Sequence, residues 1–115
     1  MEKHYDLAFL NDYFDDDVNA ILPILTMNLE ETPKELLSIQ NSLLKNETAA
    51  AKAGTHKIKT NVAMMGIHDR STFVNDMHLM KPTDEITEGV LQQFEQFKEA
   101  IGTALQEIRE DFFSE

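Results

Sequence analysis

The sequence predicts an all-α fold: an antiparallel up-down-up-down four-helix bundle with a short extra helix at the amino terminus. Apolar residues recur at three- and four-residue spacing along almost the whole chain, and the alternation typical of strands is absent. Only four glycines and three prolines interrupt the 115 residues. Short connections between amphipathic helices imply antiparallel neighbours, which gives the bundle. A chain of this length folds as one domain, residues 1–115.

Two helices are expected before residue 45. Residues 5–11 predict a short first helix, and the carboxylates of residues 15–17 offer an N-cap and first-turn negative charge for the second. Pro33 interrupts this second helix, so we expect a kink or a break near Thr32, and the unbroken apolar register favours a kink. The inward residues are Leu7 and Leu10 in the first helix, then Val18, Ile21, Leu22, Leu25, Leu29, Leu36, Ile39 and Leu43.

Three more helices follow. Glu47 or Thr48 begins the third, which ends at Gly66, and Asp69 caps the fourth. Thr83 or Asp84 caps the last helix, expected to be the longest at about eight turns. The buried side of the fourth helix consists of Phe73, Val74, Met77 and either Leu79 or Met80. The last helix buries Ile86, Val90, Phe94, Phe97, Ile101, Ala104 or Leu105, Ile108 and Phe112.

Composition excludes several classes of protein. The net charge of -11 repels nucleic acid and anionic lipid, and no cluster of basic residues offsets it. The chain has no cysteine, no signal-peptide pattern and no apolar run long enough to span a bilayer, so we expect a cytoplasmic protein that is not bound to a membrane. No pair of histidines has the spacing of metal ligands, so no metal site is expected.

The charge is unevenly distributed. Residues 45–70 hold five of the ten basic side chains but only two of the twenty-one acidic ones. This locally cationic segment would favour a bound phosphate or an acidic partner surface. An equally plain interpretation is that every acidic protein has some less acidic face.

His56 lies on the outward face of the third helix. At about 100° per residue, Ile58, Val62 and Met65 fall within about 40° of one another. His56 points roughly 160° away from them, toward water. Taken alone, such a residue is most often a solvated surface histidine.

The pattern His56-x-Ile58-Lys59, with Gly66 ten residues after the histidine, resembles the signature of histidine-containing phosphotransfer (HPt) domains of two-component phosphorelays. Thr60 departs from it, because the family usually has glycine at that place. The resemblance covers nearly the whole chain, since the start, the long helical stretch and the acidic-apolar tail are laid out as in that family.

The resemblance implies a phosphorelay intermediate, with His56 phosphorylated and Lys59 stabilising the phosphate. Gly66 would be the helix-end glycine of the motif. The partners would be response-regulator receiver domains, which carry an acceptor aspartate and Mg²⁺, and a hybrid sensor histidine kinase. The surface that would face them consists of Lys52, Ala53, Lys57, Thr60 and Ala63.

The residues around His56 are consistent with a carrier that is not an enzyme. A histidine in model peptides has a pKa of about 6.5, so at pH 7 a ring nitrogen offers a lone pair for attack on phosphorus. No general base, phosphate-binding glycine loop or metal-ligand set accompanies His56, so the partner must supply the electrostatics and metal, and the chain needs no cofactor of its own. We expect a free-standing monomer.

Thr60 keeps a second hypothesis open. Four residues after His56, a β-branched side chain lies directly against the imidazole and could obstruct an approaching receiver. Its hydroxyl could instead donate to phosphate or position the ring. The alternatives to a carrier are a pseudo-HPt module that docks and regulates a receiver or kinase without being phosphorylated, and a generic helical adaptor.

Overall fold

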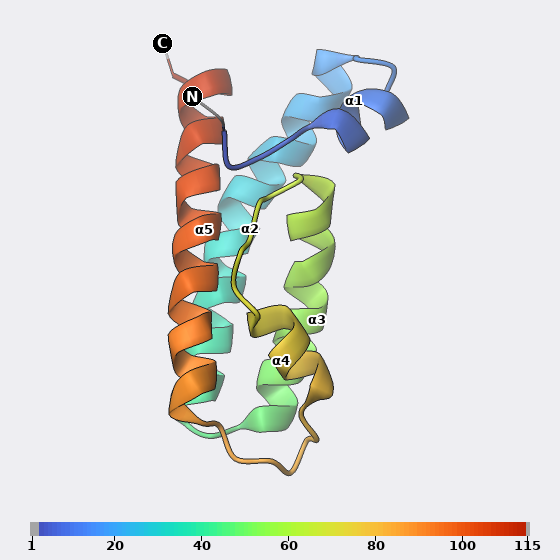
Figure 1. The fold of residues 1–115 in the computed structure, drawn as a ribbon. Coiled ribbons are helices and arrows are strands. Elements are labelled where there is room, and N and C mark those ends of the chain that lie inside the picture. The colour runs from blue at the N-terminus through green and yellow to red at the C-terminus, as the bar shows by residue number, and fades with distance from the viewer. Residues whose placement is uncertain (1–2, 115) are drawn as a thin grey trace.

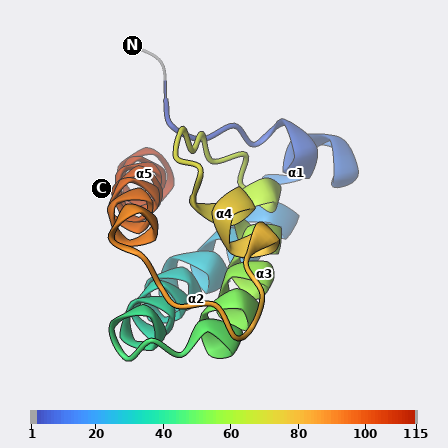
Figure 2. The ribbon, with the colours of Figure 1, turned by 60° about the horizontal axis from the view of Figure 1, so that its bottom comes forward.

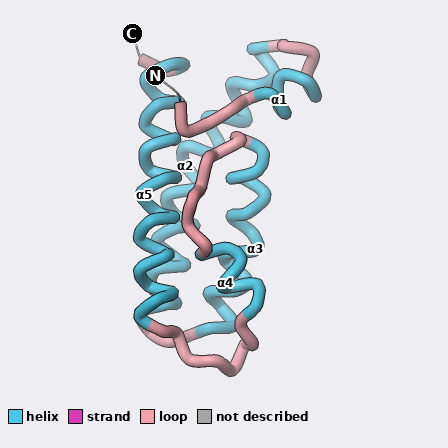
Figure 3. Tube along the Cα trace, viewed as in Figure 1, coloured by secondary structure: helices cyan, strands magenta, loops and turns pink. Residues whose placement is uncertain are grey.

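The computed structural model describes residues 3–114, in which every regular element is a helix. The helices are α1 (Ala8–Tyr13), α2 (Val18–Leu44), α3 (Thr48–Met64), α4 (Phe73–Leu79) and α5 (Glu88–Phe112). The sequence-based expectation of an all-α protein with five helices is confirmed (Figure 3).

Helices α2, α3, α4 and α5 contact one another in a ring around the core. Along the long axis of the molecule α3 and α5 rise while α2 descends, and the short α4 lies in front of them (Figure 1). Seen obliquely toward the lower end, α4 sits between α3 and α5, and α1 projects to one side (Figure 2). None of the helices in residues 3–114 has the length and apolar character required to cross a bilayer.

Helix α2 runs unbroken through Pro33, so the break considered near Thr32 does not occur. A proline has no N–H to donate to the carbonyl four residues earlier. The carbonyl of Leu29, freed in this way, accepts a hydrogen bond from Nη2 of Arg109 in α5 at 3.4 Å. At 27 residues α2 is also longer than α5, which has 25, so the expectation that the last helix is the longest is wrong.

The first helix begins three residues later than expected, although Leu7 and Leu10 are buried as predicted. Residues 3–7 instead form an irregular segment, here called the strap, that lies between α5 and the end of α3. Of the three carboxylates at 15–17, only Asp17 caps α2, by accepting the N–H of Asn19 at 3.0 Å. Asp15 and Asp16 have positive φ and make the turn, so they add no charge to the first turn of the helix.

The starts of α4 and α5 also differ from the prediction. Asp69 accepts the N–H of Ser71 in the preceding turn, and Thr72 is the N-cap of α4. Thr87 caps α5 by accepting the N–H of Val90 at 3.2 Å. Asp84 cannot serve there, because its carboxylate accepts the N–H of Lys81 in a separate turn that precedes the helix.

The core is built largely from the predicted stripes. Phe73, Phe94 and Phe97 pack as an aromatic cluster with ring centroids 5.1 to 6.5 Å apart. Ala104 and Leu105 are both buried, whereas Phe112 at the end of α5, which was expected to be buried, is exposed. Of Leu79 and Met80, it is Met80, the residue directly after α4, that packs against the core, and Leu79 is exposed.

Candidate functional site

Helix α3 presents His56 to solvent, as its apolar pattern predicts. The inward face of the helix carries Ala51 and Ile58, which are fully buried, and Thr55, whose hydroxyl donates to the Ala51 carbonyl at 2.8 Å. Gly54 brings α3 close to α2, because a Cβ at this position would lie 2.9 Å from Cγ1 of Ile39. A glycine in the middle of a predicted helix is a signal for such a close approach.

Two recesses meet at His56. The α4-side recess, about 190 Å³, lies between α3 and α4, and the α1-side recess, about 390 Å³, lies between α3 and α1. His56 and Lys59 line both of them. The other residues of the α4-side recess are Lys52, Thr55, Val74, Met77 and His78, and those of the α1-side recess are Phe9, Thr60, Ala63 and Met64.

The recesses are locally cationic on an acidic protein. Among the described residues that line them, none is a carboxylate, although the chain has 21 acidic side chains and a net charge of -11. Lys59 is exposed and lies one turn from His56, so its ammonium is available to an anion at the ring. The arrangement can therefore hold a phosphate near the imidazole.

Lys52 lines the α4-side recess, but its ammonium is directed at α4. Nζ donates to the carbonyls of Met77 at 2.6 Å, His78 at 3.2 Å and Met80 at 2.5 Å. A cation at the last carbonyls of a helix satisfies acceptors that have no partner within it. Lys52 is thus tied to α4, whereas the sequence predicts it as a partner-facing residue beside His56.

The remaining residues of the predicted partner-facing surface are exposed. Ala53 and Lys57 lie outside both recesses, whereas Thr60 and Ala63 line the α1-side recess with His56. The positive charge of Lys57 lowers the pKa of Glu35 in α2. Desolvation raises the pKa of Glu35, and the charge of Lys57 and the hydrogen bond from Asn61 offset this rise only in part.

Gly66 ends α3 in the manner expected of a helix-end glycine. Its φ is +58°, a left-handed conformation that glycine adopts without steric cost. The N–H groups of Gly66 and Ile67 return to the carbonyls of Ala63 and Val62 at 3.1 and 3.0 Å. A second reason for glycine here comes from the strap, because a Cβ at residue 66 would overlap the carbonyl oxygen of Asp6.

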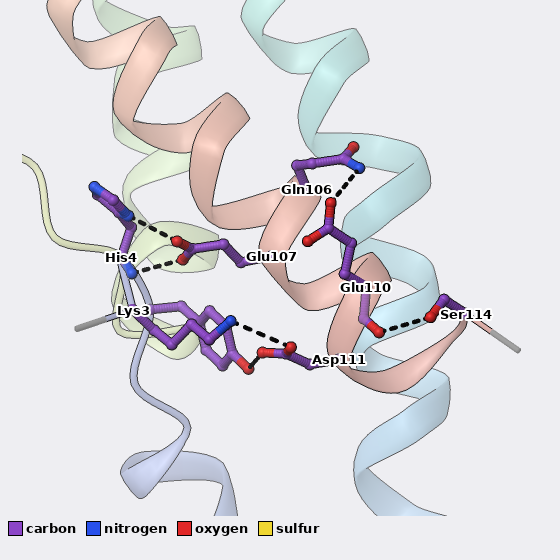
Figure 4. A network of polar contacts seen from close by, with 8 residues as sticks. Lys3, His4, Gln106, Glu107, Glu110, Asp111 and Ser114 are labelled. Carbon is purple, nitrogen blue, oxygen red and sulfur yellow. Dashed lines mark hydrogen bonds and ion pairs between the residues drawn. The ribbon is translucent and has the colours of Figure 1, made fainter. Parts of the chain in front are cut away.

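The strap joins the end of α3 to α5. The N–H of Asp6 donates to the Met65 carbonyl at 3.2 Å, and the N–H of His68 donates to the His4 carbonyl at 2.8 Å. On the α5 side, the backbone N–H of His4 donates to Glu107 at 2.6 Å, and its Nδ1 lies 2.9 Å from the same carboxylate (Figure 4).

Asp111 completes this contact with α5. It accepts hydrogen bonds from the Tyr5 hydroxyl at 2.5 Å and from Lys3 Nζ at 3.3 Å. The hydrogen bond from Tyr5 lowers the pKa of Asp111, and Lys3 acts in the same direction. Desolvation would raise the pKa of Glu107, but the hydrogen bonds and charge of His4 lower it overall. We call the contact of these two carboxylates with Lys3, His4 and Tyr5 of the strap the clasp, and no sequence pattern predicts it.

Comparison of the chain with models of protein families, with curated proteins and with solved structures found no match. Within residues 3–114, no group of three or more His, Asp or Glu side chains is arranged to hold a metal ion. The function must therefore be argued from the site itself.

Proposed function

We propose that this chain is a histidine-containing phosphotransfer carrier, and that α2 to α5 form the up-down-up-down four-helix bundle of that class. The observation that carries the proposal is an exposed imidazole, His56, beside the ammonium of Lys59, at the meeting point of two recesses with no carboxylate among their described lining residues. On a chain with a net charge of -11, such a place is suited to holding a phosphoryl group.

The transfer step uses the lone pair of a His56 ring nitrogen. This nitrogen attacks the phosphorus of an aspartyl phosphate on a receiver domain, so a nitrogen–phosphorus bond forms and the acyl oxygen–phosphorus bond breaks. The receiver carboxylate leaves with the electron pair, and the proton on the other ring nitrogen passes to solvent. The reverse step on a second receiver returns the phosphoryl group to a carboxylate and leaves the imidazole free.

The partner completes the chemistry in this proposal. Phosphoryl transfer needs charge stabilisation on three equatorial oxygens, for which metal ions are the usual source. Lys59 supplies one positive charge from this chain, and the receiver domain with its Mg²⁺ supplies the rest. We propose that the chain acts as a cytoplasmic monomer, between a hybrid sensor histidine kinase and a response regulator.

Thr60 favours one alternative function. Its side chain lines the α1-side recess together with His56, where glycine would leave more space. A receiver could then dock on this face without bringing its aspartate into line with the imidazole. The alternative is a pseudo-HPt module that binds a receiver or kinase and regulates it without accepting phosphate.

The test is transfer from a phosphorylated receiver domain in the presence of Mg²⁺. We expect an acid-labile, alkali-stable phosphate that mass spectrometry maps to His56 and that is lost in His56→Gln. His68→Gln is the matched control, because His68 is also exposed but lies outside both recesses. Phosphate that persists in His56→Gln would overturn the assignment.

Thr60→Gly separates the carrier from the docking module. A steep rise in the transfer rate would show that Thr60 obstructs the receiver. Receivers that bind but transfer nothing to either form would reject the carrier and support the docking function.

A further inference from the structure

A third cavity lies between the strap, α5 and residues 65–72, which join α3 to α4 and are here called the connecting segment. In Figure 1 the connecting segment runs between α3 and α5 toward α4. The cavity measures about 430 Å³, which is within the range of small-molecule sites, and neither His56 nor Lys59 lines it. We call it the strap cavity, and its lining residues are Lys3, His4, His68, Arg70, Ser71, Gln96, Glu99, Ala100 and Thr103.

Basic and titratable nitrogen groups dominate the charge of the strap cavity. Four of the nine lining residues are lysine, arginine or histidine, and one, Glu99, is acidic. The chain as a whole has the opposite balance, with a net charge of -11. In the connecting segment His68 and Arg70 are exposed and line the cavity, whereas Ile67 is buried and Asp69 is half-buried. Alternate residues of this segment therefore face the cavity.

Hydrogen-bond donors from the connecting segment are available to a ligand. None of the ion pairs found within residues 3–114 involves Arg70 or Glu99, although both residues line the same cavity. The Ser71 hydroxyl oxygen accepts the N–H of Phe73 at 3.3 Å, which leaves its own O–H free to donate. The guanidinium and this hydroxyl can thus both donate to an oxygen of a bound molecule.

The clasp fixes the two basic side chains that the strap contributes. Glu107 and Asp111 bind His4 and Lys3, but neither carboxylate lines the cavity. Asp111 accepts one of the three donors of the Lys3 ammonium. His4 faces Glu107 with Nδ1, so Nε2 points away from that carboxylate (Figure 4). Both side chains are therefore held in place while they still line the cavity.

We propose that the strap cavity binds a small organic anion, whose carboxylate or phosphate group contacts Arg70 and His68. These two residues carry the charge that the clasp carboxylates do not offset. The planar fork of a guanidinium matches two oxygens of a carboxylate or phosphate. The side chains of Ser71, Gln96 and Thr103 can bind further oxygens of the ligand. The proposal goes beyond the carrier function and does not depend on it.

A ligand in the strap cavity would contact the strap, the connecting segment and α5 together. Two backbone hydrogen bonds join the strap to the end of α3, from Asp6 to Met65 and from His68 to His4. A ligand that binds only the folded arrangement stabilises it by mass action. The bound anion should therefore slow hydrogen exchange of the Asp6 and His68 amides.

Citrate and pyrophosphate are the probes, one for a carboxylate ligand and one for a phosphate ligand. Isothermal titration calorimetry gives the dissociation constant, and NMR locates the bound probe. We expect saturable binding of at least one probe, with shifts of the His4 and His68 imidazole resonances and slower exchange of the Asp6 and His68 amides. The probe that binds more tightly identifies the group that the cavity prefers. No saturable binding of either probe up to about 10 mM would overturn the proposal.

Two substitutions in the cavity should act in opposite directions. Arg70→Gln should raise the dissociation constant by about tenfold or more, the size of one lost hydrogen bond to a charged group. Glu99→Gln should lower it by about two- to fivefold, because it removes the carboxylate among the described lining residues.

Lys98→Gln is the matched control for the change in net charge. Lys98 neighbours Glu99 on α5 and pairs with Glu95, but it does not line the cavity. We expect its dissociation constant to stay close to that of the wild type. A constant that is unchanged in Arg70→Gln, or raised no more than in Lys98→Gln, would overturn the proposal.

His56→Gln separates the strap cavity from the recesses at His56. If pyrophosphate bound in those recesses, its affinity would fall in His56→Gln, and this result would overturn the strap cavity as the binding site. An unchanged dissociation constant in His56→Gln, with the loss expected in Arg70→Gln, would establish a separate site. The measurement uses no receiver domain and no phosphoryl transfer, so its outcome does not depend on whether His56 accepts phosphate.

Discussion

Replacing Gly66 with alanine should destabilise the protein through two separate effects. The residue has a φ of +58°, and a left-handed conformation costs a residue with a Cβ about 1–2 kcal/mol. The new Cβ would also overlap the carbonyl oxygen of Asp6, which is backbone and cannot rotate away. The strap must therefore move away from the end of α3.

The magnitude follows from the contacts that this movement breaks. The strap makes two backbone hydrogen bonds beside Gly66, Asp6 to Met65 at 3.2 Å and His68 to His4 at 2.8 Å. Each contributes about 1 kcal/mol net. Together with the conformational cost, we expect Gly66→Ala to lower the free energy of unfolding by about 3–4 kcal/mol.

Urea denaturation followed by circular dichroism measures this loss, and Gly102→Ala is the matched control. Gly102 lies inside α5 and is exposed, with open space where a Cβ would be. Alanine there should raise the free energy of unfolding by about 0.5–1 kcal/mol, because glycine loses more backbone entropy in a helix. A Gly66→Ala protein within about 0.5 kcal/mol of the wild type would refute this reasoning, since such a difference is ordinary for a neutral surface change.

Two further predictions concern capping and acid stability. Thr87→Ala should cost about 1 kcal/mol in urea denaturation because it removes the N-cap of α5, whereas Thr83→Ala should cost little; equal losses would contradict the observed start of the helix. Folding lowers the pKa of Glu107 and Asp111, so the clasp stabilises the fold above the ordinary pKa of these carboxylates and loses that contribution as the pH falls through their folded values. Glu107→Gln should therefore lose less stability between about pH 5 and pH 3 than the wild type; parallel pH profiles would contradict this role.

The interiors of the helices could be predicted because burial repeats with the helical period. Spacing alone assigns Leu25, Ile39, Phe94 and Ile101 to the core, and all four are buried. Helix starts were predicted less well, since Asp69 and Asp84 are good N-cap residues that the structure uses in turns instead. Which of several neighbouring capping residues begins a helix depends on how the connection packs, and this is not a local property of the sequence.

The part of the candidate site that lies on α3 could be predicted from the sequence. The exposure of His56 and the proximity of Lys59 follow from the geometry of a single helix. The direction of the Lys52 side chain does not follow from one helix, because the three carbonyls that accept its hydrogen bonds belong to residues 25 to 28 positions later in the chain. His78 joins the recess for the same reason.

The helical class, the buried stripes and the outward face that carries His56 could all be predicted from the sequence, because each depends on periodicity within one helix. The packing of α4 against α3, which places His78 in the same recess as His56, and the position of the strap between Gly66 and Glu107 depend on the tertiary structure. Such contacts join residues far apart in the chain, and the hydrogen bonds and charges that fix them exist only once the helices have packed.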